Sequence, residues 1–157
     1  MRCLFLLLAA WLSAAPLHAE PLSFDQPIHN AARLGSGDDV RQALAANPAA
    51  RDSRTSLGSL PIHLAAMNPD LSALRALIAA GANVNARDGE GATPLHMAAY
   101  ASRATHARVL LEAGADAQAT TDNGRDPTSM ARKVKADEAA GIISLWILKG
   151  CKAGKPC

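Results

Sequence analysis

The chain has 157 residues, of which 49% are hydrophobic but only 3% aromatic, and its formal net charge is +2. This length suits one domain, and the shortage of aromatic residues indicates a core of Ala, Leu, Ile and Val in closely packed helices. The charge is too small to indicate a nucleic-acid or membrane-surface partner.

Residues 1–19 have the pattern of a secretory signal peptide. A single arginine precedes an apolar run that is too short to span a bilayer as a helix, and small residues follow it. We expect cleavage after Ala19, which makes the mature protein periplasmic or secreted; the alternative is an uncleaved segment that anchors the protein to a membrane. Removal of the signal leaves two cysteines, Cys151 and Cys157.

Four segments of the remaining chain share one pattern around a proline. They read QPIHNAA, LPIHLAA, TPLHMAA and DPTSMAR, with prolines at positions 27, 61, 94 and 127, at intervals of 34, 33 and 33 residues. A period this regular indicates a solenoid of stacked units.

Each unit reads as two helices followed by a turn. The proline predicts the start of a short first helix, since it has no N–H to leave unsatisfied, and Thr93 and Asp126 are the expected side-chain caps in the last two units. A second helix follows and is expected to end at Asn47, Gly81 or Gly114, residue types that accept a left-handed conformation. The segments rich in Gly, Asn and Asp that come next predict turns projecting away from the helices.

These units resemble ankyrin repeats. The resemblance is clearest where TPLHMAA is followed by VLLEAGADAQATTDNG, and LPIHLAA by ALIAAGANVNARDGEG. It implies an all-α ankyrin-repeat solenoid of about four helix-turn-helix units with short β-like turns. The predicted organisation is a repeat domain over 20–148, with units at about 24–57, 58–90, 91–123 and 124–148, and a tail over 149–157. Ser129 replaces the histidine in the last unit, as suits an irregular capping repeat.

Three histidines, His29, His63 and His96, occupy one position of the repeat. The resemblance implies that they hydrogen-bond the turns of their own and adjacent repeats. A shared metal is the alternative, but equivalent positions in a stack lie about 8–10 Å apart, whereas a zinc ligand lies about 2 Å from its ion. We therefore predict structural histidines and no metal site. His106 belongs to no pattern and is expected to be exposed or partly packed.

No motif for catalysis or cofactor binding occurs: there is no nucleophile elbow, HExxH, phosphate loop or CxxC. The sequence thus predicts a protein that is not an enzyme and holds no cofactor. Cys151 and Cys157 predict a small disulfide loop in an exported protein. The alternative is a thiol-based redox enzyme or peroxide sensor that uses the same two cysteines beside several lysines.

The first helices and turn tips of a repeat stack form one face that is free to bind. By register, a first stripe of positions on this face either lines a groove or packs between repeats: Asn30, Leu64, Met97 and Met130. A second stripe and the turn tips are the predicted protein contacts: Arg33, Met67, Tyr100, Lys133, Arg54, Arg87, Asp88, Glu90, Asp122, Asn123 and Arg125. Their mixed charges favour a folded polar protein over nucleic acid or anionic lipid.

The expected function is that of a monomeric, non-enzymatic periplasmic module for protein–protein interaction. Small exported bacterial ankyrin proteins of the kind that this chain resembles have been linked to protection against peroxide alongside catalase, and others are immunity proteins that mask secreted toxins. The resemblance implies a role of one of these two types. A membrane-tethered scaffold is expected only if the signal segment stays attached.

Overall fold

The computed structural model describes residues 25–155, so the predicted signal segment and Cys157 lie outside the described residues. This part of the chain is all-α, as predicted, and contains no strand. Its elements are α1 (Pro27–Leu34), α2 (Gly37–Ala46), the 3-10 helix η1 (Pro48–Asp52), α3 (Pro61–Met67), α4 (Leu71–Ala79), α5 (Pro94–Tyr100), α6 (Ala104–Glu112), α7 (Pro127–Lys133) and α8 (Asp137–Leu148).

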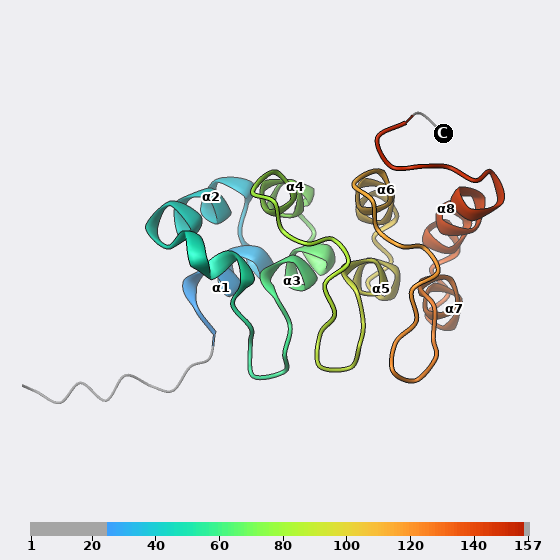
Figure 1. Ribbon diagram of the computed structural model, residues 1–157, viewed down its shortest axis with the longest axis horizontal. Coiled ribbons are helices and arrows are strands. Elements are labelled where there is room, and N and C mark those ends of the chain that lie inside the picture. The colour runs from blue at the N-terminus through green and yellow to red at the C-terminus, as the bar shows by residue number, and fades with distance from the viewer. Residues whose placement is uncertain (1–24, 156–157) are drawn as a thin grey trace, which may run out of the picture.

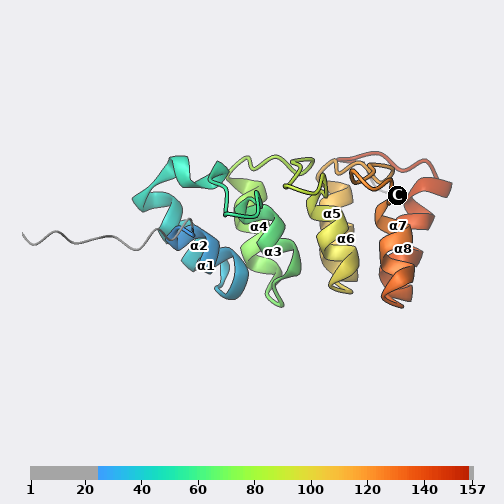
Figure 2. The ribbon, with the colours of Figure 1, turned by 90° about the horizontal axis from the view of Figure 1, so that it is seen from below.

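The helices form two parallel rows. The first helices of the units, α1, α3, α5 and α7, pack one against the next, and the second helices, α2, α4, α6 and α8, make the other row (Figure 1). Seen from below, successive helix pairs follow one another as layers of a stack (Figure 2). The predicted solenoid is therefore confirmed, and its turns all project from the side of the first helices (Figure 1).

Small and aliphatic side chains fill the space between the layers. Ala65, Ala66, Ala98 and Ala99 on the first helices are fully buried, which lets adjacent units approach closely. The second helices contribute larger buried side chains, among them Leu74, Leu77, Leu110, Leu111 and Ile143. A stack of thin helices of this kind needs few aromatic residues, in agreement with the composition.

Each first helix begins at its proline, as predicted, and one of the two predicted side-chain caps is present. The carboxylate of Asp126 accepts a hydrogen bond of 2.8 Å from the backbone N–H of Ser129, which is the expected cap. The expected cap by Thr93 is wrong, because its side chain makes no capping hydrogen bond and its hydroxyl lies 2.9 Å from Nδ1 of His96. At this helix start, both the backbone N–H and the hydroxyl of Thr93 contact Nδ1 of His96.

The second helices end in two ways. Gly81 and Gly114 follow α4 and α6 with φ of 77° and 99°, in the predicted left-handed region. The same prediction is wrong for Asn47, whose φ of −147° is extended. The difference follows from Pro48, since a residue before proline is driven into extended backbone, and the chain enters η1 instead.

The three repeat histidines join each helix start to the following turn. In each, Nδ1 accepts the backbone N–H of the residue before the proline, over 2.8 Å from Gln26, 3.2 Å from Leu60 and 3.1 Å from Thr93. An accepting Nδ1 carries no proton, so each neutral ring has its proton on Nε2. Nε2 therefore donates to the backbone carbonyl oxygens that it approaches, namely Ser53 at 3.1 Å, Ala86 and Ala92 at 3.1 Å each, and Arg125 at 2.9 Å.

His106 is buried, with 4% of its surface exposed, so its predicted exposed or partly packed position is wrong. Pro69 and Leu71 from the unit before and Glu138 from the unit after line the same pocket as its ring. Burial lowers the pKa of His106, and its Nε2 makes no hydrogen bond with the described residues. The neighbours on both sides could not be seen in the pattern of α6 alone.

Two further findings concern residues 25–155 only. None of the helices is long and apolar enough to cross a membrane. No group of three or more His, Cys, Asp or Glu side chains in this part is placed to hold a metal ion.

Candidate functional site

Three turns with the same backbone geometry border the face of the first helices. Each is closed by one hydrogen bond from an N–H to the carbonyl oxygen four residues later: Thr55 to Ser59 (2.9 Å), Asp88 to Ala92 (3.0 Å) and Thr121 to Arg125 (2.9 Å). The glycine just before the last residue of each turn has a positive φ, between 71° and 76°. The turns thus repeat as regularly as the helices, and they project together beyond the first helices (Figure 1).

The carboxylate of Asp88 shapes the second turn from within. It accepts hydrogen bonds of 2.9 Å from the backbone N–H groups of Glu90 and Ala92. The side chain is half-buried, and both bonds end on Oδ1, which therefore faces its own turn. The sequence predicted Asp88 as a protein contact, which stays a prediction; the structure adds a local hydrogen-bonding role for Oδ1.

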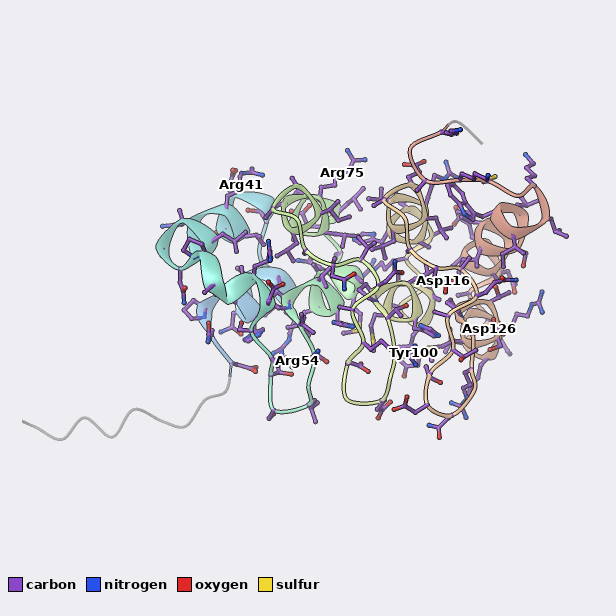
Figure 3. All side chains as sticks on the ribbon, in the orientation of Figure 1. Arg41, Arg54, Arg75, Tyr100, Asp116 and Asp126 are labelled. Carbon is purple, nitrogen blue, oxygen red and sulfur yellow. The ribbon has the colours of Figure 1, made fainter. Side chains whose placement is uncertain are left out.

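Two predicted contact arginines link one turn to the next. The guanidinium of Arg54 donates to the carbonyl oxygen of Arg87 over 3.0 Å, and that of Arg87 donates to the carbonyl oxygen of Thr120. Arg87 also lies 3.6 Å from the carboxylate of Asp122. Figure 3 labels Arg54 beside the first turn. One nitrogen of each guanidinium therefore links its turn to the next.

Burial keeps the central histidines neutral beneath the turns. Loss of water around the ring is the largest cause that lowers the pKa of His63, and the same cause dominates for His96. Neutrality is required because a proton on Nδ1 would remove the acceptor of the backbone N–H. His96 in this form fixes the carbonyl group of Arg125, and so positions the end of the third turn.

An open groove lies between the second and third turns and the helices α3, α5 and α7. We call it the methionine groove, and its volume is about 320 Å³. Its lining residues come from the last three units: Met67, Glu90, Ala92, Met97, Tyr100, Thr121, Asn123, Arg125, Met130 and Lys133. Figure 3 labels Tyr100 between the second and third turns.

The floor of the groove is adaptable and apolar. Met67, Met97 and Met130 are partly buried, and Tyr100 beside them is 57% exposed. Methionine side chains are flexible and polarisable, and tyrosine offers a large apolar ring with one polar end. Such a floor suits an inserted apolar side chain of a partner.

The rim of the groove is charged, with more positive than negative groups. Arg125 and Lys133 carry exposed cations, and Glu90 carries the one carboxylate among the residues that line the groove. Asn123 adds an exposed amide from the third turn. This rim suits a partner that presents an acidic or polar group next to its apolar side chain.

The predicted contacts therefore separate into two groups. Six of them share the methionine groove: Met67, Glu90, Tyr100, Asn123, Arg125 and Lys133. Arg33 lies in the first unit, where it pairs with Asp25 at 3.2 Å. The first stripe divides as well, because Met97 and Met130 line the groove while Leu64 is buried in the core and Asn30 is exposed on α1.

Sequence reasoning missed two residues of the groove, Ala92 and Thr121. Both lie at the base of a turn, where the hydrogen bond between its two arms is formed. A small side chain at the base of a turn leaves space between turn and helix. Ala92 lies two residues before the repeat proline Pro94, and this fixed spacing could have indicated that it lines the groove.

The C-terminal tail turns back toward the second helices. The backbone N–H of Cys151 donates to the carbonyl oxygen of Trp146 over 3.1 Å, and that of Gly154 donates to the carbonyl oxygen of Glu112 over 3.2 Å. Figure 1 shows this segment passing from α8 over the end of α6. Because Cys157 lies outside the described residues, the loop between the two cysteines stays a prediction.

Comparison with known families agrees with this geometry. A family model described as ankyrin repeats, in three copies, matches residues 28–121. A comparison with curated proteins found no match. The matched segment runs from the second residue of α1 through α6 and ends before α7, where the histidine of the repeat is replaced by Ser129.

Proposed function

Because the chain belongs to the ankyrin repeat family, we propose that it is a non-enzymatic binding module that holds a folded protein partner in the methionine groove. Ankyrin repeats serve protein–protein interaction, and the repeat stack accounts for most of this chain. The observation that carries the proposal is the convergence of three methionines and a half-exposed tyrosine in one open groove. Exposed side chains of this kind on a rigid repeat surface are typical of contact residues.

The groove also indicates the chemistry of the partner. A loop or extended segment with an apolar side chain would fill the floor, and an acidic neighbour would meet Arg125 and Lys133 on the rim. The contact would involve the last three units, since the turns and helices around the groove belong to them. The first unit then serves to cover the apolar side of the second.

We place this module outside the cytoplasm, on the signal pattern of residues 1–19 and the two cysteines that would remain after cleavage. In that compartment Cys151 and Cys157 would close a small loop at the end of the tail. Peroxide protection alongside catalase and toxin immunity, the two roles implied by the resemblance, differ in the partner that fills the groove. Identification of that partner decides between them.

The test uses crosslinking of the protein in the producing cells, identification of the captured partner and measurement of its affinity with purified proteins. We expect the double variant Met97→Ala and Tyr100→Ala to weaken binding by about thirtyfold, because truncated central contacts cost about 2 kcal/mol or more. Because Met97 packs against the core, some loss of thermal stability is expected, and affinities are compared at a temperature at which circular dichroism shows both proteins to be folded.

The matched control is Arg75→Ala, on the exposed side of α4 and far from the groove (Figure 3). This variant should bind the partner with unchanged affinity. Equal affinity of the wild type and the double variant would reject the methionine groove as the binding site.

A further inference from the structure

The methionines of the repeat stack all lie in one place. The chain has four methionines, and apart from Met1, which lies outside the described residues, they are Met67, Met97 and Met130. These three come from three different helices, α3, α5 and α7, and all of them line the methionine groove. The buried hydrophobic residues of the described core are Ala, Leu, Ile and Val instead. The thioether groups of the stack are therefore gathered at its candidate binding surface.

The groove leaves these methionines open to solvent. Each of the three residues is partly exposed, and Tyr100 beside them is 57% exposed (Figure 3). Oxidants convert the thioether of an accessible methionine into a sulfoxide, which is polar where the thioether was apolar. A small oxidant can thus reach the floor of the groove, whereas the fully buried residues between the described layers include no thioether.

The groove also contains groups that suit the oxidised side chains. A sulfoxide oxygen accepts hydrogen bonds, and Asn123, Arg125 and Lys133 carry amide, guanidinium and ammonium donors on the rim of the same groove. Met67 and Met97 also pack against the core, so their oxidation is expected to cost some stability. The main change is in the floor, which becomes polar like the rim and no longer suits an apolar side chain.

We propose that the methionine groove is a site of reversible methionine oxidation, and that this modification closes the groove to an apolar side chain. The oxidant is a peroxide: the sulfur lone pair attacks one oxygen of hydrogen peroxide, the O–O bond breaks and an S–O bond forms. The sulfur loses two electrons, and the departing hydroxide takes the proton of the transferred oxygen and leaves as water. Two thiols of a methionine sulfoxide reductase reverse the step, forming a disulfide and water.

The first test locates the modification in the free protein. The purified full chain is treated with hydrogen peroxide, and mass spectrometry of its peptides shows where oxygen has been gained. We expect Met67, Met97 and Met130 each to gain one oxygen atom while circular dichroism shows that the stack stays folded. Groove methionines that stay reduced while free methionine is oxidised in the same solution would overturn the proposal. A chain that unfolds on oxidation would do so too, because the change would not be confined to the groove.

The second test follows the polarity of the floor with the dye 1-anilinonaphthalene-8-sulfonate. Its apolar rings suit the floor of the groove, and its sulfonate suits the cations of the rim. Oxidation should weaken the binding of the dye about tenfold or more, because the rings would meet the sulfoxide oxygens. Reduction by the reductases for both sulfoxide epimers should restore it. A dye that does not bind the untreated protein, or binds equally before and after oxidation, would contradict the proposal.

The matched control is the triple variant Met67→Leu, Met97→Leu and Met130→Leu. Leucine keeps the apolar floor at similar volume but has no thioether, so peroxide should leave the binding of the dye to this variant unchanged. The comparison separates the groove from other groups that peroxide attacks, such as the cysteines. An equal loss of dye binding in the variant and in the wild type would show that the methionines are not responsible.

The effect on a partner rests on the proposed function, whereas the two tests on the free protein do not. Affinity for the captured partner that falls with Met97→Ala and Tyr100→Ala but is unchanged by peroxide would refute the oxidation proposal and keep the binding site. A partner that responds to neither change, together with oxidation and loss of the dye in the free protein, would refute the proposed function and keep the modification site.

Discussion

The second and third units differ from the fourth at the position that gave the clearest sequence signal. In the central units this position holds His63 and His96, each buried and hydrogen-bonded at both ring nitrogens. In the fourth unit it holds Ser129, whose hydroxyl donates only to the carbonyl oxygen of Asp126, over 2.8 Å. The surrounding helices α3, α5 and α7 nevertheless have the same length and begin at the same proline.

The difference between the central units and the fourth unit shows the structural role of the repeat histidine. Each histidine reaches from its own helix start to a carbonyl group of the turn that follows, and in the fourth unit α8 is followed by the tail instead of a further turn of this kind. Without that carbonyl group an imidazole at this exposed position would have no turn to bind to. The start of α7 is satisfied locally by Asp126 instead. The histidine therefore belongs to the boundary between units and not to the helix that carries it.

The largest effect should come from removing a central histidine. His63→Ala leaves the N–H of Leu60 and the carbonyl oxygens of Ala86 and Ala92 without their partner in a buried region. Unpaired buried groups cost about 1–3 kcal/mol each, and some will regain partners, so we expect a loss of about 3 kcal/mol in the free energy of unfolding. Urea denaturation monitored by circular dichroism measures it.

Ser129→Ala is the comparison for that experiment. Ser129 is exposed, and its backbone N–H keeps the carboxylate of Asp126, so the change should stay within about 0.5 kcal/mol. Similar losses from the two substitutions would show that the histidine acts within its helix and not across the boundary.

A smaller effect separates the first turn from the third. Gly58 and Gly124 have nearly the same φ, 76° and 71°, so alanine costs each about 1 kcal/mol of backbone strain. A Cβ atom on Gly58 would also lie 2.9 Å from the backbone nitrogen of Gly89 in the next turn, whereas one on Gly124 meets nothing within 4 Å.

We therefore expect Gly58→Ala to destabilise the protein by about 2 kcal/mol and Gly124→Ala by about 1 kcal/mol, because only the first has a turn packed against it. Thermal unfolding of both variants side by side measures the difference. Equal midpoints would contradict the close packing of successive turns.

Most of the fold could be predicted from the sequence because the units repeat, so that each unit can be compared with the next. The prolines, the glycines after α4 and α6 and the repeated histidine each recur at a fixed interval, and a local rule explains each one. The predictions failed where one residue has an unusual neighbour. Asn47 is extended because Pro48 follows it, and His106 is buried beside residues of two other units.

The candidate site could be predicted only in part, for a related reason. Register placed Met67 and Tyr100 on one face, and the structure joins them to Met97 and Met130 in one groove. Register cannot tell whether an exposed arginine points outward or along the stack. Arg54 and Arg87 each donate a hydrogen bond to a backbone carbonyl group 33 residues further on. The sequence does not indicate these partners.

The smallest effect is a dependence of stability on pH that comes from the central units. Burial lowers the pKa of His63 and His96 below the ordinary value of 6.5, so near and below that pH the unfolded chain binds more protons than the folded one. The free energy of unfolding should therefore fall as the pH is lowered from about 7.5 to 5.5, with a slope for each histidine of at most about 1.4 kcal/mol per pH unit. Urea midpoints at several pH values measure the slope, and His63→Gln should reduce it because one titrating ring is lost. Ser129→His adds an exposed imidazole at the same repeat position and should leave the slope unchanged. If it increased the slope as much as His63→Gln reduced it, the pH dependence would come from the number of histidines and not from their burial beneath the following turn.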